Sequence, residues 1–149
     1  RKMRLGGLSE VLVKMREHGN KIGVTRKNVQ TTLSNEIRAR QMAELGVDGS
    51  AAEMEVFNRA AVSEPARDEN DLRNFESLLF KIFEANRTKG IFNQQLLETM
   101  GASHFRGLCR DALVRGNRFG RYYWRSGIAQ LDHCTMREWL GLVYRSCLR

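Results

Sequence analysis

The sequence predicts a mainly α-helical protein, a helical bundle that contains helix-turn-helix or winged-helix-like units. Three observations support this fold class. Apolar residues recur every three or four positions through most of the chain, as one buried face of a helix requires. The 149 residues include one proline and are only 8% aromatic, a composition that does not favour a β-sandwich. Turns that contain glycine separate the apolar-periodic stretches.

The charge distribution divides the chain into three segments. The formal net charge is +8 and the pI is about 9.9, which favours a polyanionic partner. Residues 1–49 include ten basic and five acidic residues, residues 50–76 include three basic and seven acidic, and residues 77–149 include twelve basic and five acidic. The predicted organisation is an N-terminal helical basic lobe with a possible helix-turn-helix over 1–62, an acidic linker over 63–71, and a C-terminal winged helix-turn-helix-like lobe over 72–149.

Three helices are expected in the N-terminal lobe. The first begins near Ser9, and the second begins near Thr25. The second has apolar residues at four-residue steps, and it is either one long helix or two helices with a break near 34–35. The third begins after Ser50, because Ser50 and Glu53 have the spacing of a capping box.

The C-terminal lobe begins with a helix over about 71–86, whose acidic first turn suits the helix dipole. An apolar-periodic helix over 92–100 is then expected to stop at Gly101, and a second helix over 103–115 to end at Gly116. Helix, tight turn and helix form the layout of a helix-turn-helix, although an ordinary helical hairpin has the same pattern. A capping-box pair, Thr135 and Glu138, predicts a final helix over 136–148.

Arginines and aromatic residues are interleaved in the segment that follows this helix pair. From 104 to 126 there are six arginines, one aspartate and no lysine, and four rings lie at positions 119 and 122–124. Glycines at 116, 120 and 127 indicate turns, so a short β-hairpin near 118–128 is expected to form the wing. Arginine suits phosphate and guanine recognition because its guanidinium is a planar, multi-donor group. The other interpretation is that the rings are core residues and the arginines pair with the acidic segment.

These patterns predict a sequence-directed DNA-binding protein, such as a transcription regulator or a plasmid or phage replication-partition factor. Helix 103–115 would enter the major groove, and the hairpin would lie on the backbone or in the minor groove. In the N-terminal lobe, a second exposed polar face could make further contacts. The predicted contact residues are Ser103, His104, Arg106, Arg110, Arg115, Arg118, Arg121, Tyr122, Arg125, Arg26, Lys27 and Asn28.

Two other functions are considered. One is an RNA-binding or nucleocapsid-type helical protein whose tyrosines and tryptophan stack on unpaired bases. The other is a helical protein-interaction module or effector that binds no nucleic acid. Duplex DNA is favoured over RNA as the partner, and a homodimer through helix 136–148 is plausible.

Catalysis has little support in the sequence. The three histidines are far apart, and the chain has neither a phosphate-binding glycine loop nor a CxxC or HxxxH pair. We therefore expect no enzyme activity, no metal and no cofactor. The three cysteines indicate a reduced, intracellular protein. No run of about 18 apolar residues occurs, so no membrane association is expected.

The chain also has a possible internal repeat. A shift of 67 residues aligns 10–49 with 77–116, with seven identities in 40 positions and with glycines that mark the same helix ends. This alignment suggests a duplicated three-helix unit.

Overall fold

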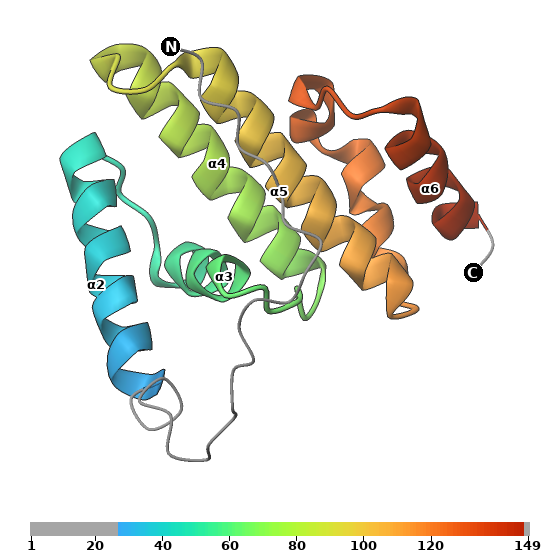
Figure 1. The fold of residues 1–149 in the computed structure, drawn as a ribbon, viewed down its shortest axis with the longest axis horizontal. Helices are drawn as coiled ribbons and strands as arrows, with labels where there is room; N and C mark the ends of the chain where they lie inside the picture. Colours follow the sequence, from blue (N-terminus) through green and yellow to red (C-terminus); the bar gives the residue numbers. More distant parts are fainter. Residues whose placement is uncertain (1–26, 148–149) are drawn as a thin grey trace, which may run out of the picture. The chain divides into compact units, whose positions relative to one another are not determined.

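The computed structural model describes residues 27–147, where the chain is mainly helical and contains no strand (Figure 1). The mainly α-helical prediction is therefore confirmed. The helices, with η for a 3₁₀ helix, are α2 (Lys27–Leu45), α3 (Ala51–Ala61), α4 (Glu69–Lys89), α5 (Gln94–Val114), η1 (Arg118–Arg125), η2 (Gly127–Leu131) and α6 (Met136–Cys147). The chain divides into two compact units, 1–34 and 35–149, and the contacts below belong to the second.

Several predicted helix ends are confirmed. Ser50 and Glu53 form the expected capping box, in which each side chain accepts a hydrogen bond from the other residue's backbone N–H. Thr135 and Glu138 make the same reciprocal contacts at the start of α6. α2 is one helix through positions 34–35. The helix predicted near Ser9 lies outside the described residues.

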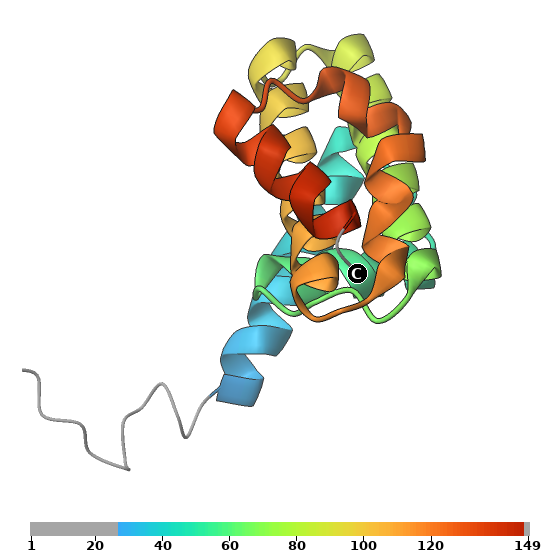
Figure 2. The same ribbon diagram turned by 90° about the vertical axis from the view of Figure 1, so that its right-hand side faces the viewer.

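Helices α4 and α5 run side by side and form the centre of the second unit (Figures 1 and 2). Leu72, Leu78 and Phe83 on α4, and Phe105 and Cys109 on α5, are almost fully buried. Each large apolar side chain removed from water contributes roughly 2 kcal/mol. This core fixes α5, and α5 in turn positions the arginine-rich segment that follows it.

The predicted turn at Gly101 is wrong, because α5 continues unbroken from Gln94 to Val114. A Cβ atom at Gly101 would lie 2.7 Å from Cζ of Phe83 and 3.2 Å from Cδ2 of Leu79. The missing side chain therefore lets α5 approach α4 closely. Glycine here is a packing residue inside a helix, and the helix-turn-helix predicted at this position is not present.

The predicted β-hairpin near 118–128 is also wrong, because this segment forms η1 and η2. A Cβ atom at Gly120 would lie 2.4 Å from the carbonyl oxygen of Cys109, so η1 presses directly against the backbone of α5. Glu76 on α4 holds the other end, since its buried carboxylate accepts hydrogen bonds from Ser126 Oγ at 2.6 Å and Gly127 N at 2.9 Å. These contacts lie across the bundle, where a local pattern of glycines and rings gives no sign of them.

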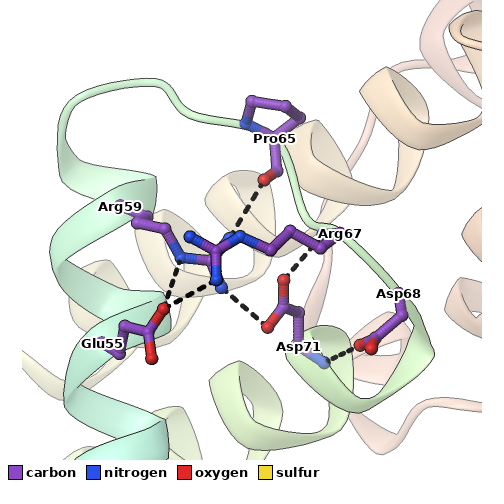
Figure 3. Close-up of polar contacts among 6 residues, drawn as sticks. All are labelled: Glu55, Arg59, Pro65, Arg67, Asp68 and Asp71. Carbon is purple, nitrogen blue, oxygen red and sulfur yellow. Dashed lines mark hydrogen bonds and ion pairs between the residues drawn. The ribbon is translucent and has the colours of Figure 1, made fainter.

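The connection from α3 to α4 lies within the predicted linker and is held by ionic contacts (Figure 3). Arg59 of α3 donates to the carbonyl oxygen of Pro65 at 3.3 Å and pairs with Asp71 of α4 at 2.7 Å. The second oxygen of Asp71 accepts from the backbone N–H of Arg67 at 2.6 Å. Asp68 caps α4, so this acidic stretch shapes the turn between two packed helices.

The 67-residue offset recurs in the positions where the helices begin. α2 and α5 begin at residues 27 and 94, α3 and η1 at 51 and 118, and α4 and α6 at 69 and 136, each pair 67 residues apart. The two copies differ in the element that follows α2 or α5. In the first copy this element is the α-helix α3, and in the second copy it is the pair of 3₁₀ helices η1 and η2. Residues 10–26 of the proposed first copy lie outside the described residues.

Candidate nucleic-acid interface

Three arginines converge on a small hollow where α5, η1 and α6 meet. Arg118 and Arg121 of η1 and Arg145 of α6 line it, together with Leu113, Gly116 and Asn117. No acidic residue in the described part of the chain lines this hollow. Its volume is about 10 Å³, so an anion would rest across the rim and could not enter.

The end of α5 determines how the arginines of η1 are presented. Gly116 has a φ of 84°, and the N–H groups of Gly116 and Asn117 bond back to the carbonyls of Leu113 and Ala112. This is a Schellman motif, which ends the helix and reverses the chain. Positions three apart in a 3₁₀ helix lie on the same side, so Arg118 and Arg121 face the same direction.

Arg115 is the exposed C-cap residue of α5, and it directly precedes Gly116, which lines the hollow. We call Arg115, Arg118, Arg121 and Arg145 the arginine patch. Within the described part of the chain, Arg115, Arg121 and Arg145 have no carboxylate at ion-pair distance. The carbonyl ends of α5 and α6 carry partial negative charge that favours nearby cations, which is one structural reason for arginines here. The charged groups of Arg115, Arg121 and Arg145 are exposed to solvent and can attract an anion.

Three other predicted arginines, Arg106, Arg110 and Arg125, pair with carboxylates. Arg106 is largely enclosed, and its guanidinium contacts Asp132 at 3.3 Å and Glu138 at 3.1 Å. Arg125 pairs with Glu69 at 3.2 Å. In a separate pair, Arg110 contacts Asp111 at 3.3 Å. Arg106 therefore joins α5 to the segment before α6 and to α6 itself, where the sequence suggested a base contact.

The aromatic rings between these arginines are mostly covered. Tyr123 is 3% exposed, and its hydroxyl donates to Asp132 at 2.8 Å. The guanidinium groups of Arg73 and Arg125 lie 5.2 and 5.8 Å from the centre of the Tyr122 ring, and the Tyr122 hydroxyl donates to Glu76. Desolvation and this carboxylate raise the pKa of Tyr122 to about 12.

Trp124 keeps a larger exposed surface, 40%, and packs edge-on against Tyr123 and Trp139. Its indole N–H donates to Ser146 of α6 at 3.1 Å. Of the three rings at 122–124, Trp124 therefore has the most surface available for a ligand.

The remaining predicted contacts lie elsewhere. Ser103 and His104 are exposed on α5 and line a second hollow with residues of α3 and the following turn. They do not line the hollow formed by the arginines. Arg26 lies outside the described residues. Lys27 and Asn28 open α2, and their side chains are also outside the described part.

Sequence reasoning missed Arg145 as a candidate. Its position in the last turn of α6 is visible in the sequence, but that position alone indicates only a favourable helix-dipole contact. Its proximity to Arg118 and Arg121 depends on how α6 packs beside η1 (Figure 2).

A second surface feature is an apolar groove of about 490 Å³ on a different part of α5. It lies between the C-terminal end of α2, α3, α4 and the first half of α5. Among the side chains that form its walls are Met42, Phe57, Phe83, Phe92, Met100 and His104.

Comparison of the chain with protein-family models, with curated proteins and with solved structures gives no match. Within residues 27–147, none of the helices has the length and apolar composition needed to cross a bilayer. The same residues contain no group of three or more potential metal ligands.

Proposed function

We propose that this protein binds nucleic acid by contacting backbone phosphates with the arginine patch. The observation that carries the proposal is the convergence of Arg118, Arg121 and Arg145 around a hollow that has no acidic residue among its described lining residues. Guanidinium groups bind phosphate oxygens through two parallel hydrogen bonds, and several on one surface can follow a backbone. The net charge of +8 adds a long-range attraction of the same sign.

Duplex DNA is the first ligand to test. Phosphate contacts position a protein on a duplex, while base contacts provide the sequence preference. Ser103 and His104, exposed on α5, are the predicted groups that could still reach base edges. Stacking on single strands has less support, since Tyr122 and Tyr123 already hydrogen-bond to carboxylates.

Fluorescence anisotropy with a labelled DNA duplex and a labelled single-stranded RNA tests this proposal. Loss of one direct phosphate contact commonly weakens binding by about 1 kcal/mol or more, because hydrogen bonds to charged groups contribute roughly that much. The double variant Arg121→Ala/Arg145→Ala is therefore expected to raise the Kd at least tenfold.

Arg87→Ala is the matched control, because it also removes an exposed arginine but on α4 and away from the hollow. It should change the Kd no more than about twofold. If Arg87→Ala, which removes one charge, produced half of the change in log Kd caused by the double variant, which removes two, net charge alone would account for binding. The absence of binding to both ligands at low salt would exclude the proposed function.

A further inference from the structure

Helix α6 presents an apolar stripe to solvent. Met136, Leu140 and Tyr144 are four residues apart, and each is more than half exposed. The stripe is separate from the buried side of α6, where Leu142 is 2% exposed. Contiguous exposed apolar surface on a folded protein usually marks an interaction site.

The helix that begins 67 residues earlier, α4, has no such stripe. Positions 136, 140 and 144 correspond to 69, 73 and 77 of α4 at the 67-residue offset. In α4 these positions are Glu69, Arg73 and Ser77, all polar. The apolar stripe is therefore not a property that α4 and α6 share.

The groove has the properties of a receptor for such a helix. On its rim, Phe92 and Met100 are each more than half exposed. A groove with apolar walls binds an amphipathic helix through side chains that recur every three or four residues on one face, and the anchors of the α6 stripe recur every four.

The charges of the two surfaces are complementary. Among the described residues that line the groove, Glu44 is the only carboxylate, and none is a lysine or an arginine. Glu44 has one ion-pair partner, Arg40 at 3.9 Å, and both side chains of this pair are exposed. On α6, Arg137 borders the stripe and is exposed. The acidic residue of α6, Glu138, is turned toward Arg106 and away from a partner.

We propose that α6 of one copy binds in the groove of a second copy, with Met136, Leu140 and Tyr144 as anchors and Arg137 facing Glu44. The two surfaces are different patches of the same chain, so the contact is head-to-tail, and a pair of copies keeps one free groove on one copy and one free α6 on the other. Such a contact forms rings or growing chains instead of a closed symmetric dimer. It uses residues other than the arginine patch, and it does not depend on nucleic-acid binding.

Complementation between two single variants tests this arrangement in the full chain without nucleic acid. Met100→Glu places a charge in the groove, and Leu140→Glu places one in the stripe. Sedimentation velocity over a concentration series should show self-association of the wild type and only monomer for either variant. A mixture of the two variants should recover a one-to-one dimer, because the intact α6 of one meets the intact groove of the other.

Gln130→Glu is the control, since Gln130 is exposed and lies neither on α6 nor among the groove-lining residues. It should associate like the wild type, and circular dichroism should show unchanged helicity in all variants. Monomeric wild type at every concentration overturns the proposal. So does association that survives Met100→Glu, the result expected for α6 paired with α6 in a symmetric dimer. A mixture that stays monomeric overturns it as well.

A charge exchange tests the orientation. Glu44→Lys should weaken association roughly fivefold, the magnitude of a partly exposed ion pair, and adding Arg137→Glu should restore it. Equal weakening by the single and double variants would contradict the proposed register.

Discussion

Replacing Gly101 by alanine tests the close packing of α4 and α5. In a helix interior, alanine is favoured over glycine by about 1 kcal/mol. At this position, however, the new methyl group would lie 2.7 Å from the ring of Phe83, which is 1% exposed and belongs to the hydrophobic core. Overpacking of this kind costs about 1–3 kcal/mol. We therefore expect Gly101→Ala to lower the free energy of unfolding by about 1 kcal/mol.

Gly107 provides a matched control on the same helix. A Cβ atom there would meet nothing within 4 Å, so Gly107→Ala should raise the free energy of unfolding by up to about 1 kcal/mol. Because the helix-propensity gain is the same in both variants, their difference isolates the clash and should be about 2 kcal/mol.

Urea denaturation followed by circular dichroism at 222 nm measures both variants. With an m-value of about 2 kcal/mol/M, the two midpoints should differ by about 1 M. Equal stabilisation by both substitutions would refute the packing, because it would mean that no side chain of α4 approaches Gly101.

Three further variants test other contacts by the same denaturation assay. Gly120→Ala should cost more than Gly101→Ala, at least about 2 kcal/mol, because the obstacle is the backbone carbonyl of Cys109; an equal or smaller loss would contradict the tight η1–α5 contact. Burial raises the pKa of Glu53, but hydrogen bonds led by Lys81 outweigh it and lower the pKa to about 2. Its contribution, about 3 kcal/mol, is present above pH 4.5 and is lost as the pH falls toward 2. Glu53→Gln should therefore be less stable than wild type at pH 7 and should approach it at low pH, whereas a constant difference would contradict the shifted pKa. Asn86→Ala should cost about 2 kcal/mol, because it removes the buried side chain that bonds both the N–H and the carbonyl oxygen of Phe92 in the α4–α5 turn; a neutral effect would contradict that role.

Local sequence patterns predicted the helix boundaries well. The capping boxes at Ser50 and Thr135 and the end of α5 at Gly116 depend on residues within a few positions of each other, so their physical causes are visible in the sequence. The 67-residue offset, found from the sequence, also matches the helix starts of the structure.

Contacts between distant segments were not predictable in the same way. Gly101 could end a helix or allow two helices to approach, and only the position of Phe83 distinguishes these roles. Arg106 has the sequence context of an exposed arginine, but Asp132 and Glu138, more than 20 residues away, enclose it. The sequence therefore predicted contacts from the exposed face of a recognition helix, whereas the candidate site in the structure is the arginine patch, which includes Arg145.

The salt dependence of duplex binding is the most direct test of the arginine patch. Each phosphate contact contributes about −0.9 to the slope of log K against log salt, so four contacts predict a slope of about −3.6 for the wild type. Arg121→Ala/Arg145→Ala should reduce the slope to about −1.8, while Arg87→Ala should leave it unchanged. A wild-type slope near zero, or the same slope for the wild type and the double variant, would contradict phosphate binding by this patch.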